Sequence, residues 1–193
     1  MLLLSGQLRS VPIMSLQTGT EIARTHAAII DPRKLQIVAF YVQGQLIENH
    51  PSVLFIEDIR EHGNLGFIVD DSTKIMRLDN LVRLQQIINY HFELLGIRVI
   101  DRYKRKIGRV GDYSIDNKSY YIDQIHIKPS PLRRITTTSN IIHRTQIVSI
   151  NNQCITIDTP DERVASNDNK LSINNFTNPF RRTQPQPDQS ETD

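Results

Sequence analysis

The sequence has one cysteine, Cys154, and no tryptophan among its 193 residues. A single cysteine excludes an intrachain disulfide and a thiolate metal site, because such a site needs several clustered ligands. The six histidines stand singly, without metal-site spacing. No apolar run approaches the roughly 18 residues of a membrane span, and the run at residues 1–4 is too short for a signal-peptide core. We therefore expect a cytoplasmic protein without membrane insertion, and we name no metal-binding or cofactor-binding residue.

Local signatures of catalysis are also missing. The sequence contains no Gly-x-x-x-x-Gly-Lys-Ser/Thr, Gly-x-Ser-x-Gly, His-Glu-x-x-His or Cys-x-x-Cys pattern. Their absence excludes the chemistries that depend on these short motifs. A triad assembled from a distant Ser, His and Asp would leave no such local trace. We name no catalytic residue and expect a protein that is not an enzyme.

Isoleucine is abundant, with 27 residues. β-Branched side chains pack well on pleated surfaces, so this composition favours β structure, although a codon bias toward isoleucine would raise the count in any fold. Charge is unevenly placed: the net charge is −2 over residues 1–95, +6 over residues 96–160 and −2 over residues 161–193. The positive charge of the chain therefore lies in its middle segment.

An internal repeat organises the chain up to residue 160. At a shift of 85 residues, residues 22–24 (Ile-Ala-Arg) align with residues 107–109 (Ile-Gly-Arg), and Ile-Asp at 30–31 aligns with Ile-Asp at 115–116. At a shift of 88 the alignment continues to residues 155–158. In both copies the strand after the Ile-Asp turn changes the parity of its apolar positions midway, which predicts a β-bulge at the same place. The sequence therefore favours duplication of one module, with chance similarity between β-rich stretches as the alternative.

One helix is expected between the two copies, over residues 79–95. Asp79 is a candidate N-cap and Gly96 a candidate terminator. Apolar residues recur at helical spacing between them: Leu81, Leu84, Ile88, Phe92 and Leu95. The resulting domain prediction is a first module over residues 1–77, a connecting helix over 78–95, a second module over 96–160 and a disordered tail over 161–193.

The second copy carries the clearest family pattern. It has Leu-Gly-Ile-Arg-Val-Ile-Asp at residues 95–101 and Lys-Ile-Gly-Arg-Val at 106–110, followed by Ile-Asp at 115–116. This pattern resembles the PRC-barrel family, named for a domain shared by the photosynthetic reaction-centre H subunit and a ribosome-maturation factor. The first copy is similar but has Ala23 where glycine is usual. The resemblance covers about residues 8–70 and 94–158.

The resemblance implies a fold and a broad role. It implies that each copy is a small β-barrel, so the expected fold is mainly β: two tandem PRC-type barrels joined by one helix, with a disordered C-terminal tail. Members of the family resemble scaffolds that bind proteins or ribosomal components, and the fold has no shared catalytic residues.

A cluster of basic residues in the second copy is the first candidate site. It consists of Arg102, Lys104, Arg105, Lys106 and Arg109, with Tyr103 among them. Clustered Lys and Arg near a tyrosine could neutralise phosphates and stack a base. A solvated β-turn that discourages edge pairing would show the same residues. The matching turn of the first copy, residues 17–20, has no positive charge.

The second candidate site lies in the tail. Residues 161–193 contain too few apolar side chains to offset the entropy of ordering. Within them a short motif combines two aromatics, a proline and a basic pair: Phe176, Asn178, Pro179, Phe180, Arg181 and Arg182. Such a motif is typical of an anchor that orders on binding a protein, although a spacer with two chance phenylalanines, or docking on the protein's own barrel, would account for it too.

The sequence therefore favours a non-enzymatic adaptor that binds a protein partner through the tail motif, without identifying that partner or an oligomeric state. The alternative is a ribosome- or RNA-associated factor that uses the basic turn.

Overall fold

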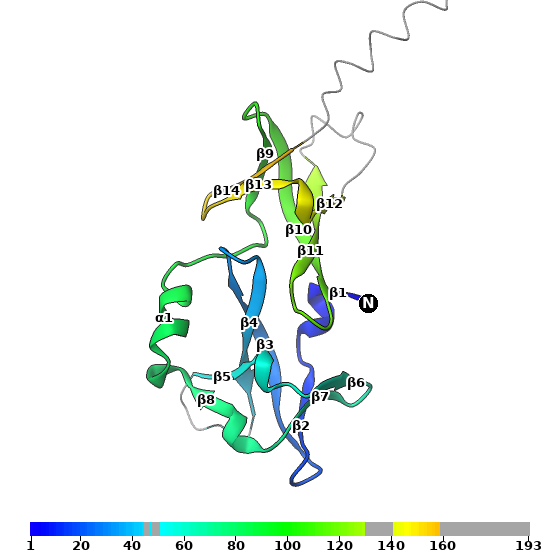
Figure 1. Ribbon diagram of the computed structural model, residues 1–193, viewed down its shortest axis with the longest axis vertical. Helices are drawn as coiled ribbons and strands as arrows, with labels where there is room; N and C mark the ends of the chain where they lie inside the picture. Colours follow the sequence, from blue (N-terminus) through cyan, green and yellow to red (C-terminus); the bar gives the residue numbers. More distant parts are fainter. Residues whose placement is uncertain (45–46, 48–50, 130–140, 159–193) are drawn as a thin grey trace, which may run out of the picture. The chain divides into compact units, whose positions relative to one another are not determined.

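The computed structural model describes residues 1–44, 47, 51–129 and 141–158, and over these residues the chain is mainly β, as predicted. The strands form two sheets of seven strands each (Figure 1). The first sheet contains β2 (Pro12–Ser15), β3 (Glu21–Asp31), β4 (Gln36–Gln43), β5 (Ser52–Phe55), β6 (Glu61–Gly63), β7 (Gly66–Val69) and β8 (Ile75–Arg77). The second contains β1 (Leu2–Leu4), β9 (Arg98–Asp101), β10 (Lys106–Asp116), β11 (Ile122–Pro129), β12 (Ile141–His143), β13 (Ile147–Ile150) and β14 (Cys154–Ile157).

The two sheets repeat one pattern of strand pairing. The first sheet has the order β6-β7-β2-β3-β4-β5-β8, and the second has the order β12-β11-β10-β9-β14-β13. In the first, β2 pairs antiparallel with β3 and parallel with β7; in the second, β9 pairs antiparallel with β10 and parallel with β14. Short 3-10 helices stand at matching places, η2 (Ile56–Asp58) after β5 and η6 (Arg144–Gln146) after β12.

The β-bulges also lie at matching positions, 85 residues apart. On β3 the register against β4 shifts between Thr25 and Ala27, and on β10 the register against β11 shifts between Val110 and Asp112. A second shift on the partner strands leaves Val38 on β4 and Asp123 on β11 as the extra residues. This second bulge is where the apolar parity changes in the sequence, so the bulge prediction is confirmed.

The N-terminal strand departs from the predicted module boundary. β1 pairs antiparallel with β10 in the second sheet, with Leu3 opposite Ile115. Leu3 is 8% exposed, whereas Leu2 and Leu4 are 42% and 43% exposed, so β1 buries its central side chain. Residues 1–77 are therefore not one module, because residues 2–4 belong to the second sheet. Only three residues make this strand, and nothing in their pattern indicates which sheet they join.

Two glycines of the family-like pattern have backbone reasons. Gly96 has a φ of +80°, which other residues rarely adopt. At Gly108 a Cβ atom would lie 2.4 Å from the carbonyl oxygen of Lys128 on β11, so a side chain there would push the two strands apart. The matching residue of the first copy, Ala23, tolerates its methyl group and is 2% exposed. Gly96 is therefore explained by its backbone conformation, and Gly108 by the close approach of β11.

A hairpin joint connects the two sheets. The turn between β3 and β4 meets the turn between β10 and β11, and Gln36 forms an antiparallel bridge with Tyr121. The Ile37 N–H donates to the Tyr120 carbonyl at 3.0 Å, and the Ile122 N–H donates to the Leu35 carbonyl at 2.9 Å. Residues 35 and 120, 36 and 121, and 37 and 122 are all equivalent in the 85-residue repeat. The joint is therefore reciprocal, as in an isologous interface between two identical chains.

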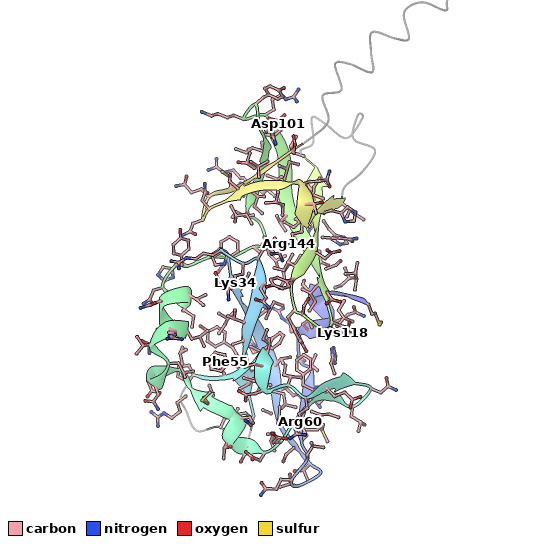
Figure 2. All side chains as sticks on the ribbon, in the orientation of Figure 1. Lys34, Phe55, Arg60, Asp101, Lys118 and Arg144 are labelled. Carbon is pink, nitrogen blue, oxygen red and sulfur yellow. The ribbon has the colours of Figure 1, made fainter. Side chains whose placement is uncertain are left out.

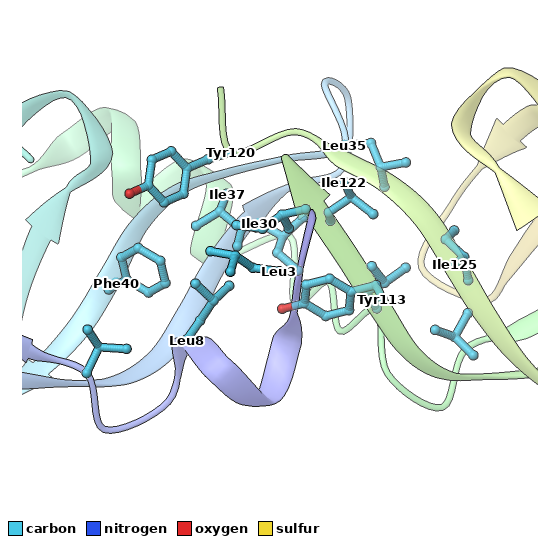
Figure 3. Close-up of a cluster of buried hydrophobic side chains, with 14 of the residues drawn as sticks. Leu3, Leu8, Ile30, Leu35, Ile37, Phe40, Tyr113, Tyr120, Ile122 and Ile125 are labelled. Atoms are coloured by element: carbon cyan, nitrogen blue, oxygen red, sulfur yellow. The ribbon is translucent and has the colours of Figure 1, made fainter. Parts of the chain in front are cut away.

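One hydrophobic core cluster contains residues from both sheets (Figure 3). Phe40 and Phe67 of the first sheet lie 5.3 Å apart between ring centroids. Tyr120, from the turn of the second sheet, lies 6.2 Å from Phe40 and 6.3 Å from Phe67. Leu35, from the opposite turn, belongs to the same cluster and is 4% exposed. The joint is thus closed by apolar packing as well as by backbone hydrogen bonds.

The helix between the copies is shorter than predicted. α1 covers Val82–Ile88, the one α-helix among the described residues. Its apolar side packs in a smaller cluster with Ile29, Ala39 and Val53, and Leu84 is the helix residue buried there. The chain leaves the helix through i to i+3 hydrogen bonds, such as the 2.9 Å bond from the His91 N–H to the Ile88 carbonyl. His91 then takes a φ of +47° and reverses the chain.

The predicted N-cap, Asp79, and the predicted terminator, Gly96, are both wrong, because α1 begins after Asp79 and ends well before Gly96. Asp79 lies inside the 3-10 helix η4 (Leu78–Asn80), where its carboxylate pairs with Arg77 at 2.7 Å. Leu81 occupies the N-cap and makes no side-chain cap bond. Gly96 lies in the approach to β9. Phe92 packs against the shared core as a linker residue beside the buried Leu94, which is 1% exposed, whereas Leu95, the last residue of the predicted stripe, is 51% exposed.

Replacing Phe40 with alanine tests whether the two sheets unfold together. Phe40 is fully buried in the shared cluster, so Phe40→Ala is expected to lower the free energy of unfolding by about 3–5 kcal/mol. Because the cluster includes both sheets, urea unfolding followed by circular dichroism and by tyrosine fluorescence should remain one transition. Leu65→Ala, at a side chain 68% exposed, is the control and should change stability by about 0.5 kcal/mol or less. Two separate transitions, with one displaced, would contradict a shared core.

Candidate functional site

The basic cluster lies in the tight turn between β9 and β10. Asp101, at the end of β9, is 1% exposed and organises this turn (Figure 2). Its Oδ1 accepts hydrogen bonds from the Tyr103 N–H at 2.9 Å and the Arg105 N–H at 2.8 Å. Its Oδ2 accepts from the Arg105 guanidinium. Lys104 takes a φ of +61° at the tip, and its N–H donates to the Asp101 carbonyl at 3.0 Å.

The electrostatics of Asp101 are set by burial and by these bonds. Burial raises the pKa of this carboxyl group, but the hydrogen bonds from Arg105 and Tyr103 and the positive charge of Arg105 outweigh it. The net result is a pKa below the ordinary value of 3.8. Asp101 is therefore ionised at neutral pH, and its charge offsets that of Arg105 within the turn.

Three of the five candidate residues already have partners. Arg105 pairs with Asp101, and its guanidinium carbon lies 5.1 Å from the centroid of the Tyr103 ring. The Arg102 guanidinium lies 2.9 Å from the Asp158 carboxylate. The Arg109 guanidinium donates to the Gly96 carbonyl at 2.8 Å. These contacts make the turn less positive than the sequence indicates, because two carboxylates from outside the motif lie against it.

Lys104 and Lys106 remain available. Neither ammonium group has a hydrogen-bond or ion-pair partner within the described part of the chain. Tyr103 beside them is 64% exposed. Two free ammonium groups next to an exposed aromatic ring can bind a phosphate group and stack a flat ring, which is a smaller site than the five-residue cluster expected from sequence.

The matching turn of the first sheet is one residue longer and has no charge. Ser15 takes the place of Asp101, is 2% exposed, and accepts a 3.3 Å hydrogen bond from the Thr18 N–H through its hydroxyl oxygen. The Ser15 N–H donates to the Thr20 carbonyl at 3.0 Å, as the Asp101 N–H donates to the Arg105 carbonyl at 3.1 Å. The turn is therefore a shared structural feature, and its basic side chains are a feature of the second sheet alone.

Arg144 is not part of the basic turn. Its guanidinium donates to the Lys34 carbonyl at 2.7 Å and lies 4.3 Å from the centroid of the Tyr121 ring (Figure 2). It also donates to the Leu35 carbonyl at 3.4 Å. Arg144 thus belongs to the hairpin joint, where it binds the turn of the first sheet.

The tail motif lies outside the described residues. This applies to Phe176, Asn178, Pro179, Phe180, Arg181 and Arg182. Arg133 and Arg134, which add to the positive charge of the middle segment, also lie outside them.

A cavity of about 550 Å³ was not expected from the sequence. We call it the β3 cavity, because residues 26–30 of β3 form one wall. The rest is formed by the 3-10 helix η1 (Ser5–Leu8) with Arg9, the end of α1, residues 91–95, Tyr41 of β4 and Tyr113 of β10. Seven polar side chains line it: Ser5, Arg9, His26, Tyr41, His91, Glu93 and Tyr113. They come from separate segments with no common spacing, so no sequence motif announces them.

The described residues also bear on metal binding and on membrane crossing. Across residues 1–44, 47, 51–129 and 141–158, no group of three or more His, Cys, Asp or Glu side chains is placed to hold a metal ion. In the same ranges no helix has both the length and the apolar character needed to cross a membrane.

Comparison with known proteins adds no assignment: no protein-family model matches the sequence, and no curated protein matches it either. The PRC-barrel resemblance therefore stays a prediction.

Replacing Asp101 tests its role in the turn. Asp101→Asn keeps an acceptor oxygen but removes the charge that Arg105 meets, so the free energy of unfolding at pH 7 should fall by about 1–3 kcal/mol. Because the folded pKa of Asp101 is lowered, its stabilisation is present above the unfolded pKa and is lost as the pH falls through the folded value. The difference between wild type and variant should therefore shrink below pH 3.8 in urea titrations.

Asp158→Asn is the matched control. It breaks an exposed ion pair with Arg102, which should be worth about 1 kcal/mol or less. A loss for Asp101→Asn no larger than that of the control would mean that the buried carboxylate does not hold the turn.

Proposed function

We propose that this chain is a non-enzymatic adaptor, built from two tandem PRC-barrel-like modules, that binds a protein partner. The repeated pairing order of the two sheets and the bulges at equivalent positions support duplication of a single module. The pattern at residues 95–101 and 106–110 is the basis for assigning that module to the PRC-barrel type.

The single observation that carries the adaptor role is the hairpin joint. An adaptor needs its binding surfaces in a fixed relation, and the reciprocal backbone bonds at Ile37 and Ile122 fix the two hairpins against each other. Tyr120 and Leu35 bury their side chains in the shared cluster at the same place. A joint with both backbone pairing and an apolar core resists the relative motion expected of modules that touch only lightly.

The proposed partner contact is the tail motif around Phe176 and Phe180. Aromatic side chains give a short peptide a large contact area at small entropic cost, and the Arg181-Arg182 pair adds attraction to an acidic rim. The double variant Phe176→Ala/Phe180→Ala should weaken partner binding by about 2 kcal/mol or more, since buried aromatics dominate such interfaces. Asn174→Ala/Asn175→Ala, in the same segment, should leave binding unchanged.

The experiment is affinity purification of the full-length chain beside a chain ending at Pro160, each with and without nuclease. The proposal expects protein partners that are recovered by the full-length chain, resist nuclease, and are lost with the tail or with the double phenylalanine variant. Recovery of the same partners by both chains would remove the tail from the proposal. Ribosomal material retained by the truncated chain and lost after nuclease would favour the second candidate.

That second candidate is a ribosome- or RNA-associated factor acting through Lys104, Lys106 and Tyr103. The observation in its favour is that both ammonium groups lack partners in the described structure while the ring beside them is exposed. In this role Lys104→Ala/Lys106→Ala should weaken binding to single-stranded RNA and reduce the slope of log affinity against log salt by about 2.

Arg33→Ala/Lys34→Ala removes the same charge from another exposed turn and is the control for that measurement. Equal losses in both variants would indicate general attraction to a cationic protein. An unchanged affinity at Lys104 and Lys106 would exclude the basic turn as the RNA site.

A further inference from the structure

The β3 cavity lies along an edge of β3 that the second sheet covers at the equivalent place. β2 pairs with β3 as far as Arg24, and Thr25 makes two further backbone bonds, to Ser10 and Val11. Beyond Thr25, no described strand pairs with β3 on the side away from β4. In the second sheet β1 covers the corresponding edge of β10 at residues 114–116. The cavity begins where that covering strand is missing.

Side chains at equivalent positions of β3 and β10 also differ, being apolar on β3 and polar on β10. In the second sheet Asp112 accepts a 2.5 Å hydrogen bond from the Ser5 hydroxyl, and Ser114 lies 2.7 Å from His126 Nε2. The first-sheet equivalents of Asp112 and Ser114 are Ala27 and Ile29, which line the cavity. Polar groups therefore satisfy one another in the second sheet, while the first sheet presents an apolar wall.

A difference in volume accompanies the difference in polarity. The equivalent of Tyr113 is Ala28, so a methyl group stands where the second sheet has a ring that is 5% exposed. Tyr113 itself lines the β3 cavity from the other sheet, together with Leu8 and Ile30 of the shared cluster (Figure 3). Residues of the packed core therefore form part of the cavity wall. The volume of the cavity falls in the range of small-molecule sites, roughly 300–1,000 Å³.

Apart from Ser5, which donates to Asp112, the polar side chains at the cavity have no partners within the described residues. Within the described residues, Arg9, His26, Tyr41, His91 and Glu93 make no side-chain hydrogen bond or ion pair, and all five line the same space. Arg9 and three side chains with N–H or O–H groups, those of His26, Tyr41 and His91, outnumber the single carboxylate. A guanidinium without a carboxylate partner suits planar recognition of a carboxylate or a similar anion.

We propose that the β3 cavity binds a small organic anion with an apolar body, its charged group at Arg9 and the two histidines and its body against Ala27, Ala28 and Ile29. An apolar pocket with a few convergent polar groups is the usual form of a small-molecule site. This site is independent of the tail and of the basic turn, so its success or failure does not decide the proposed function.

The test uses 2-naphthoate and its uncharged isostere 2-naphthamide as probes, added to the full-length chain labelled with nitrogen-15. Naphthoate should shift amide signals of residues 26–30 and 91–95, and calorimetry should show it binding at least about tenfold more tightly than naphthamide. Arg9→Gln should weaken naphthoate binding by about tenfold and leave naphthamide binding unchanged. Arg33→Gln, outside the cavity, is the matched control and should change neither.

A filling variant separates binding in the cavity from binding elsewhere. Ala28→Tyr introduces the residue of the second sheet and should abolish binding of both probes, with thermal unfolding measured to establish that the variant folds. If Ala28→Tyr does not fold, Ala27→Asp supplies the second-sheet carboxylate and should weaken naphthoate alone. Equal affinity for the two probes, or shifts confined to other residues, would overturn the proposal. So would binding of acetyl-Leu-Leu-Leu-amide at residues 26–30 without binding of naphthoate, since that would indicate a strand-binding edge.

Discussion

The reciprocal pair of hydrogen bonds between the two hairpin turns is the constraint on which the rest of this structure depends. The Ile37 N–H reaches the Tyr120 carbonyl, and the Ile122 N–H reaches the Leu35 carbonyl, so equivalent residues exchange equivalent bonds. Leu35 and Tyr120 both adopt positive φ, at +50° and +57°. A non-glycine residue holds that conformation at some cost, which is offset here because each side chain is buried in the shared core.

The hairpin joint is symmetric, so the rest of each module is free to diverge. The elements added to the two sheets differ. The second sheet gains β1 along β10, and the first sheet gains β8 beside β5 and α1 over Ile29, Ala39 and Val53. Arg144 binds the turn of the first sheet, and the first sheet makes no matching contact in return, because the equivalent residue, Ile56, has no guanidinium. The β3 cavity follows from this inequality: it lies at the edge of β3 equivalent to the β10 edge that β1 covers.

The sequence predicted what periodicity and repetition encode. The shifts of 85 and 88 residues anticipated the matching strands, and a change of apolar parity anticipated the bulges at Val38 and Asp123. It failed where tertiary contacts decide. Apolar spacing over residues 79–95 indicated one long helix, but α1 ends at Ile88. After His91 has reversed the chain, the core buries Leu94, which lies outside that spacing, and leaves Leu95 exposed. The three apolar residues at positions 2–4 carry no pattern that predicts pairing with a strand more than 100 residues away.

The charge of the basic turn was likewise not predictable from sequence alone. The sequence shows five basic side chains in and near this turn. Its net positive charge is smaller, because Asp101 and Asp158 pair with two of them. Asp101 is four residues from Arg105, but its role follows from burial, which composition does not report. The same argument applies to the polar residues along the two long strands β3 and β10. The second sheet uses its polar residues internally, at Asp112, Ser114 and His126, whereas the first leaves Arg9, His26 and Tyr41 unmatched around a cavity. The polar groups along β10 are already satisfied and stabilise the fold, so the edge of β3, with unmatched groups beside an open space, is the better place to seek a small ligand.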